Sequence, residues 1–204
     1  MIPLVIERKK MERVKSTAGD MPLLDVLPFR RLRCGVVTTG NEVFYGRIED
    51  TFTPVIEQKL KEYGMTMTAH AVCPDDRAQI VQAIQQMRDA GAELILTTGG
   101  MSVDPDDRTP AAIRDSGARI VTYGAPVLPG AMLLVGYLPG QKGETPILGL
   151  PGCVMYARRT IFDLILPRVA VGVPVTREDV TEMGEGGFCL NCAVCTYPNC
   201  GFGK

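Results

Sequence analysis

The chain has 204 residues, of which 46% are hydrophobic and 22% are charged, and its formal net charge is −1. This is the composition of an ordinary globular protein, so it excludes a chain that is disordered throughout. The nearly neutral charge argues against a nucleic-acid partner, and no apolar run is long enough to cross a membrane. Because the first residues are too charged for a secretory signal peptide, we expect a cytoplasmic protein.

Residues 1–31 show no sustained hydrophobic period. They contain a short apolar strand candidate at residues 2–6, a basic helix-like stretch at residues 7–15 and a link rich in turn-forming residues. We interpret this segment as the remnant of a preceding domain and its linker. A flexible leader is the alternative interpretation of residues 1–10.

From Leu32 onward, short β-rich runs alternate with amphipathic helical stretches. Strands are predicted at residues 33–39, 65–73, 94–98, 118–123 and 145–150. Helices are predicted to begin at Thr53, at Asp75 or Asp76, at Thr109 and at Val154. Pro167 is predicted to stop the last of them. This alternation predicts a three-layer α/β/α domain over residues 32–172, with a mainly parallel, doubly wound sheet.

Ligands of such sheets bind beyond the carboxyl ends of the parallel strands. The loops at these ends are residues 39–47, 73–77, 98–109 and 149–155. Glycine turns in front of a helix N-terminus, as in the third loop, are typical of anion capture. Three aspartates close to the same turn would repel a bare phosphate, so we expect a bridging divalent cation such as Mg²⁺. The sequence of each loop alone indicates no more than a turn between a strand and a helix, but the four loops together predict one composite site.

Six short motifs in and around these loops resemble the molybdopterin-binding domain shared by molybdopterin adenylyltransferases and molybdopterin molybdotransferases. The motifs are Thr-Gly-Asn-Glu at 39–42, Pro-Asp at 74–75, Gly-Gly-Met-Ser at 99–102, Asp-Arg-Thr-Pro at 107–110, Pro-Gly at 129–130 and Leu-Pro-Gly at 150–152. Their order and spacing resemble the family from about Leu32 to Val169. The resemblance is strongest to the C-terminal part of a molybdotransferase.

The resemblance implies a pocket for molybdopterin or its adenylylated form, with Mg²⁺ assisting chemistry at the phosphate while molybdate is inserted. Asp75 and Asp107 inherit the catalytic, Mg²⁺-associated roles. The residues that inherit ligand-binding roles are Thr39, Gly40, Asn41, Glu42, Gly99, Gly100, Met101, Ser102, Pro129, Gly130, Pro151, Gly152 and Cys153. The family also leads us to expect a homo-oligomer.

Departures from the family's pattern keep a second function open. Cys153 and Val154 follow Leu-Pro-Gly where the longer enzymes commonly have asparagine and proline. Ala131 and Met132 stand where those enzymes have lysine and proline, and their large preceding domains are represented by a few residues. The alternative is a non-catalytic carrier that delivers the cofactor to a molybdoenzyme apoprotein.

Residues 173–204 are predicted to form a tether and a short cysteine-rich, metal-binding tail. Four of the seven cysteines form a C-x₂-C-x₂-C-x₄-C run there, namely Cys189, Cys192, Cys195 and Cys200. Structural zinc sites usually join two C-x₂-C pairs through a longer spacer, so this spacing favours an iron–sulfur cluster over zinc. Redox-active or free thiols are the third interpretation. An electron-transfer module built on the tail is a further hypothesis, against which the pocket loops argue.

Two other side chains attract notice as candidate functional groups. His70, the only histidine, has no partner constellation in the sequence, so we predict a structural or surface role. Cys153 is predicted to lie at the start of a helix beside the pocket, where the helix N-terminus would lower the pKa of an exposed thiol.

Overall fold

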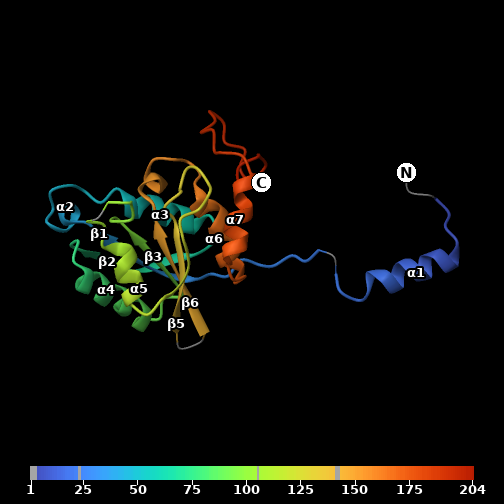
Figure 1. The fold of residues 1–204 in the computed structure, drawn as a ribbon, viewed down its shortest axis with the longest axis horizontal. Helices are drawn as coiled ribbons and strands as arrows, with labels where there is room; N and C mark the ends of the chain where they lie inside the picture. The colour runs from blue at the N-terminus through green and yellow to red at the C-terminus, as the bar shows by residue number, and fades with distance from the viewer. Residues whose placement is uncertain (1–3, 23, 105, 141–142) are drawn as a thin grey trace.

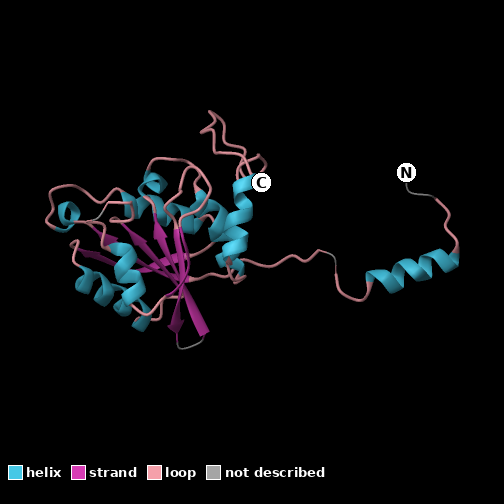
Figure 2. Cartoon of the chain, viewed as in Figure 1, coloured by secondary structure: helices cyan, strands magenta, loops and turns pink. Residues whose placement is uncertain are grey.

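A six-stranded sheet between two layers of helices forms the body of the protein in a computed structural model, which describes residues 4–22, 24–104, 106–140 and 143–204 (Figures 1 and 2). The strands are β1 (Arg33–Thr39), β2 (Thr66–Cys73), β3 (Leu94–Thr98), β4 (Arg119–Tyr123), β5 (Leu134–Gly140) and β6 (Gly143–Leu150). They lie in the order β2-β1-β3-β6-β5-β4. The first four in that order are parallel, and β5 is antiparallel to both β6 and β4. The predicted three-layer fold with a mainly parallel sheet is confirmed.

Four helices cover the two faces of the sheet. They are α3 (Phe52–Lys61), α4 (Arg77–Asp89), α5 (Thr109–Asp115) and α6 (Ile161–Val171). Buried side chains of α3 and α6 pack on one face, whereas those of α4 and α5 pack on the other. β1 and β3 lie between both layers, so nearly all of their side chains are buried. The parallel strands β1, β2, β3 and β6 all end at one edge of the sheet, which we call the ligand edge.

The strand β5 is one that the sequence pattern does not predict. Gly136 and Pro139 interrupt its apolar run, and both residue types weaken a strand prediction. In the structure, β5 pairs along its whole length with β6. The strand therefore depends on its neighbour more than on its own sequence.

The last long helix begins and ends later than predicted. Gly152–Met155 form a 3₁₀ helix, and α6 begins after a capping box formed by Thr160 and Asp163. Pro167 lies inside α6 instead of stopping it. In a regular helix the N–H of residue 167 would donate to the Asp163 carbonyl, but proline has no N–H. The Tyr197 hydroxyl donates to that carbonyl instead, at 2.6 Å. The tail thus replaces the bond that proline removes, and the helix continues without an unpaired carbonyl.

Two predicted helix caps are wrong and one is confirmed. Asp50 rather than Thr53 caps α3, because its carboxylate accepts hydrogen bonds from the first two backbone N–H groups of the helix. Thr109 lies inside the first turn of α5 and makes no side-chain cap. Asp76 caps α4 by accepting a first-turn backbone N–H at 2.9 Å, as predicted.

The N-terminal helix lies apart from the sheet, whereas the C-terminal part of the chain packs against it. The N-terminal helix α1 (Arg8–Ala18) buries no residue and lies away from the body (Figure 1). The strand predicted at residues 2–6 is absent from residues 4–6, and residues 2 and 3 lie outside the described part of the chain. After α6, the short helix α7 (Arg177–Glu182) packs Val180 into the core. None of the helices in the described ranges is long and apolar enough to cross a bilayer.

Candidate functional site

Reciprocal hydrogen bonds join the loops after β1 and β2 at the ligand edge. The backbone N–H of Asn41 donates to the Asp75 carboxylate at 2.9 Å, and the backbone N–H of Asp75 donates to the Asn41 side-chain oxygen at 3.2 Å. Asn41 opens the short helix α2 (Asn41–Phe44), whose first turn also contains Glu42. Asp75 is therefore fixed at this edge while remaining partly exposed, so its carboxylate can contact a bound ligand.

The turn after β3 has a main-chain shape that requires glycine. Gly99 and Gly100 have φ angles of 82° and 52°, in the left-handed region. A Cβ atom at Gly99 would lie 2.0 Å from the carbonyl oxygen of Thr39, at the end of β1. The hydroxyl oxygens of Thr39 and Thr109 lie 3.1 Å apart, which joins the end of β1 to the start of α5. The predicted residues Thr39, Gly99 and Gly100 thus lie together.

Asp107 lies at the far end of the same loop. Its carboxylate oxygen Oδ2 is buried and has no hydrogen-bond partner among the residues that the structure describes. Burying such an oxygen without a donor costs free energy, so the atom suits a cation or a ligand that donates a hydrogen bond. Mg²⁺ is usually bound by one or two carboxylates together with substrate phosphates. Asp107 therefore has a carboxylate oxygen that suits this ion, and Asp75 supplies a second carboxylate at the same edge of the sheet.

Tyr123 belongs to the ligand edge, although no sequence motif indicates it. It ends β4, which runs in the same direction as the parallel strands, and its hydroxyl donates to the backbone carbonyl of Ser102 at 2.9 Å. Burial and the nearby charge of Asp107 raise the pKa of Tyr123, so the hydroxyl stays protonated as a donor at neutral pH. Its position at the end of a predicted strand is the signal that could have found it.

The remaining predicted loops border the ligand edge on the β6 side. Met101 is buried and packs against Gly149, near the end of β6. The carbonyl of Pro129 accepts a hydrogen bond from the Ile161 backbone N–H at 3.0 Å, which fixes the Pro-Gly motif against the start of α6. Because β5 begins beside the end of β6, this motif and the Leu-Pro-Gly motif lie at the same edge.

Cys153 lies half-buried in the 3₁₀ helix after β6, and burial raises the pKa of its thiol. A four-residue 3₁₀ helix aligns too few peptide dipoles to lower a thiol pKa as a long helix N-terminus does. A lowered pKa is expected only of an exposed thiol, and that of Cys153 is half-buried. Pro151 and Gly152 lie at the end of β6 as expected.

His70 lies in a polar cluster between the sheet and the start of α3. Its Nε2 atom lies 3.0 Å from the Thr38 hydroxyl, 3.2 Å from that of Thr53 and 3.6 Å from the Asp50 carboxylate. Burial alone would raise the pKa of Asp50, but hydrogen bonds from Thr53 outweigh it and lower that pKa. These contacts agree with the structural role predicted for His70, and they identify Asp50 as a polar centre that the motifs missed.

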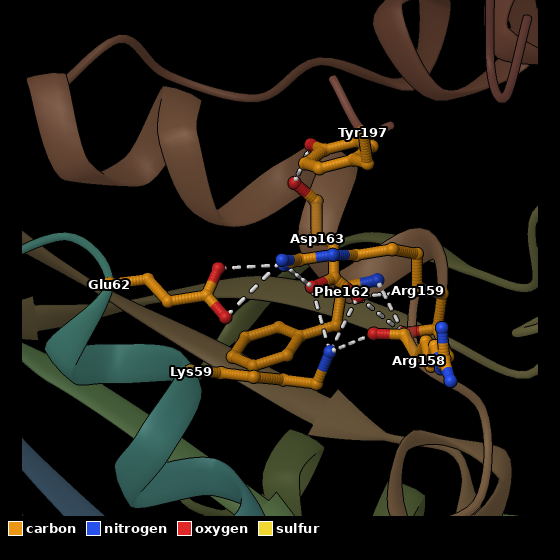
Figure 3. Close-up of polar contacts among 8 residues, drawn as sticks. Lys59, Glu62, Arg158, Arg159, Phe162, Asp163 and Tyr197 are labelled. Atoms are coloured by element: carbon orange, nitrogen blue, oxygen red, sulfur yellow. Dashed lines mark hydrogen bonds and ion pairs between the residues drawn. The ribbon is translucent and has the colours of Figure 1, made fainter. Parts of the chain in front are cut away.

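A buried ion pair joins α3 to the start of α6 (Figure 3). Lys59 Nζ donates to both carboxylate oxygens of Asp163, at 2.7 and 2.9 Å, and to the carbonyl of Arg158 at 2.9 Å. Arg159 donates to the same carboxylate at 2.8 Å and to Glu62 at 2.7 Å. The side chains of Lys59 and Asp163 are only 7% and 2% exposed. Their hydrogen bonds offset the loss of hydration and fix the segment that follows the Leu-Pro-Gly loop.

The four cysteines of the tail all line one cavity at the start of α6, and their thiols are free. Within the part of the chain that the structure describes, no three His, Cys, Asp or Glu side chains are placed to hold a metal ion. The predicted tail ligands are therefore neighbours, but they do not form a ready single-ion site.

A second cavity, of about 770 Å³, lies at the opposite edge of the sheet. Its lining includes Arg30, Arg33 and Arg88 and none of the predicted site residues. Arg33 is paired with Glu93 at 3.2 Å. Because ligands of doubly wound sheets bind at the carboxyl ends of the strands, the ligand edge and not this cavity is the candidate functional site.

These features define a class of protein: a doubly wound α/β domain with glycine turns and carboxylates at the carboxyl ends of its parallel strands. The chain belongs to the family described as "Probable molybdopterin binding domain", whose model matches residues 35–171. The matched residues include all four loops of the ligand edge and all of the sheet except the first two residues of β1. The predicted family is confirmed.

Individual relatives are similar to this chain over part of their length. The chain is 30% identical, over 142 residues, to a molybdopterin molybdenumtransferase of Synechococcus elongatus, a match that covers 66% of this chain and 34% of the transferase. Over 77 residues it is 38% identical to a CinA-like protein of Mycobacterium tuberculosis, which covers 38% of this chain and 18% of that protein. The chain thus spans about a third or less of the length of these relatives.

Solved structures show the same fold. The molybdopterin biosynthesis enzyme MoaB of Thermus thermophilus is 26% identical, with a TM-score of 0.54, over 68% of this chain and 91% of that chain. The tungsten cofactor synthesizing protein MoaB of Pyrococcus furiosus is 21% identical, with a TM-score of 0.56, over 69% of this chain and 93% of that chain. The α/β domain of this chain therefore corresponds to nearly the whole of each of these smaller proteins.

Proposed function

We propose that this chain binds adenylylated molybdopterin at the ligand edge and acts on its phosphate while molybdate is inserted. The observation that carries the proposal is the buried Asp107 oxygen, which has no hydrogen-bond donor in the described structure. It lies in the same loop as two glycine turns of the kind that let a main chain approach an anion closely. A carboxylate and an anion-binding turn in one loop are compatible when a cation lies between them.

The roles of the residues follow from this arrangement. Gly40, Gly99 and Gly100 would let the main chain approach the phosphate, and Asp75 and Asp107 would hold Mg²⁺. When bound, Mg²⁺ would neutralise charge that develops on the phosphate. Membership in the molybdopterin-binding family supports the pterin, and the transferase relative supports the reaction.

Replacing Asp107 by asparagine tests the proposal. We expect Asp107→Asn to lower Mg²⁺-dependent hydrolysis of adenylylated molybdopterin in the presence of molybdate by about 100-fold, because a loss of about 3 kcal/mol of charge stabilisation has this effect. Calorimetric titration should show that the pterin still binds. Asp106→Asn is the matched control, because Asp106 is exposed in the same loop. Equal activity of the two variants would contradict the assigned role of Asp107.

A non-catalytic carrier is the second candidate function. The observation that favours it is the pair Ala131 and Met132, which stands in place of the lysine and proline of longer enzymes and so lacks a group that would contact an anion. The partner of a carrier would be a molybdoenzyme apoprotein. Tight pterin binding without turnover, unchanged when preceding domains are supplied, would favour the carrier over the enzyme.

A further inference from the structure

The C-terminal tail, residues 186–204, is a folded part of the domain. The Cys189 N–H donates to the loop before β5 at 3.2 Å, and Arg158 donates to two consecutive tail carbonyls at 3.1 and 3.0 Å. The Tyr197 hydroxyl donates to the backbone of α6 at 2.6 Å (Figure 3). Phe202 is 3% exposed and belongs to the core on the α3 and α6 side of the sheet. These contacts hold the tail beside the start of α6.

Main-chain hydrogen bonds close the tail into a loop that contains all four of its cysteines. Gly187 N–H donates to the Gly201 carbonyl at 2.8 Å, and Gly203 N–H donates to the Gly187 carbonyl at 3.0 Å. This short parallel bridge joins the two sides of the loop. The closure reduces the conformational entropy that is lost when the four thiols gather on one ligand.

The cavity that this loop lines has the chemistry of a soft-metal site and is partly open to solvent. Cys189, Cys192, Cys195 and Cys200 line one cavity of about 280 Å³. All four thiols are free. Its border combines apolar side chains of the tail with the two arginines at 158 and 159. Thiolates bind soft metals, and Arg158 brings a positive charge close to them, whereas the charge of Arg159 is already paired with Glu62 and Asp163.

The metal-binding side chains of the tail narrow the choice of metal or cluster that the cavity could hold. Residues 186–204 contain no histidine, aspartate or glutamate, so thiolates are the only strong metal ligands in the tail. A tetrahedral zinc ion with Zn–S bonds of about 2.3 Å needs four sulfurs within about 3.8 Å of one another. Structural zinc sites usually join two C-x₂-C pairs through a longer spacer, whereas these four cysteines follow one another at spacings of three, three and five residues. An iron–sulfur cluster links thiolates through several iron and sulfide atoms, so its cysteines lie farther apart than those of a zinc ion.

We propose that Cys189, Cys192, Cys195 and Cys200 bind an iron–sulfur cluster in the cavity of the tail. The cluster enters by ligand exchange from a protein that donates a preassembled cluster. Each cysteine releases its proton to solvent as its Sγ–Fe bond forms and a ligand of the donor leaves, so no oxidation state changes. The site is independent of the pterin function, because its ligands all belong to the tail.

Iron and acid-labile sulfide analysis of the full chain, expressed with iron and purified without oxygen, tests the proposal. We expect a brown protein with about two to four iron atoms and as many sulfides per chain, and a Mössbauer spectrum of a cluster with thiolate ligands. Cys192→Ser and Cys195→Ser should each lower the iron content at least about fivefold. Cys153→Ser is the matched control and should keep its iron, because Cys153 lies outside the tail.

Three results would overturn the proposal. A colourless protein with one zinc ion per chain would identify a zinc site. A metal-free protein whose tail thiols oxidise to disulfides would identify a redox pair. Unchanged iron in Cys192→Ser and Cys195→Ser would place the cluster elsewhere. Both thiols are exposed, so thermal unfolding should show that these variants fold. Pterin binding, measured on the same samples, reports separately on the ligand edge.

Discussion

Gly99 carries the strongest single-residue constraint at the ligand edge. Its φ angle is 82°, and a Cβ atom there would lie 2.0 Å from the carbonyl oxygen of Thr39. The left-handed conformation alone costs a residue with a Cβ atom about 1–2 kcal/mol. We expect Gly99→Ala to lower the free energy of unfolding by more than this and to weaken pterin binding, because the turn must move away from β1. Urea unfolding and calorimetric titration measure the two effects.

Gly117, at the end of α5, provides the matched control for this substitution. Its φ angle is 92°, but no atom would lie within 4 Å of an added Cβ. Gly117→Ala therefore isolates the conformational cost, and its loss of stability should stay within about 1–2 kcal/mol with pterin binding unchanged. Equal losses from the two variants would show that the contact with Thr39 does not constrain the turn.

At the level of single residues, the sequence predicts the residues whose role depends on a local motif. The glycine turn at Gly99 follows from its place between a strand and a helix, and Asp76 follows from its place before a helical run. Tyr123 could not be found this way, because the carbonyl that it bonds is 21 residues away in the chain. Asp50 caps α3 through residues close to it in the chain, but its contact with His70 on β2 has no local signal.

The helices α3 and α6 are joined by the buried pair of Lys59 and Asp163, which makes their packing sensitive to one charge. Removing one partner of an isolated buried pair costs about 3–5 kcal/mol, but Arg159 also bonds the Asp163 carboxylate and keeps part of its charge compensated. We expect Lys59→Met to lower the free energy of unfolding by about 1.5–3 kcal/mol, the loss of hydrogen bonds to a charged group, as measured by urea denaturation. Glu62→Gln removes a partly exposed contact of the same network and should cost no more than about 1 kcal/mol. A loss below about 1 kcal/mol for Lys59→Met would contradict the importance of the pair.

Elements were predictable where hydrophobic period and turn signals agree, and less so where tertiary contacts decide. The alternation of strands and helices from β1 to α5 satisfies the first condition. For α6 the sequence places a stop at Pro167, but the tail residue Tyr197 bonds the carbonyl that proline leaves free. For β5 the pairing with β6 outweighs the glycine and proline within the strand. Both failures concern elements whose stability depends on a neighbour.

On the scale of the whole molecule, the tail is part of the same packing unit as the sheet, whereas the N-terminal segment is not. Phe202 and Tyr197 join the core cluster that contains α3 and α6. No described residue before Leu32 is buried, and contact with the body begins at Phe29, whose ring lies 5.1 Å from that of Tyr63. The stability of the domain should therefore respond differently to the loss of its two ends.

Truncation at each end tests this difference. Removing residues 1–27 deletes no buried side chain among those described, so we expect the midpoint of thermal unfolding to change by less than about 2 °C. Removing residues 186–204 deletes the buried Phe202 and the hydrogen bond from Tyr197 to the Asp163 carbonyl, for which Pro167 supplies no N–H. Burial of one phenylalanine stabilises by about 1.5–3 kcal/mol, so this midpoint should fall by about 5 °C or more. Calorimetry of the two truncated proteins makes the comparison, and a larger fall from the N-terminal deletion would show that residues 1–27 pack on the domain.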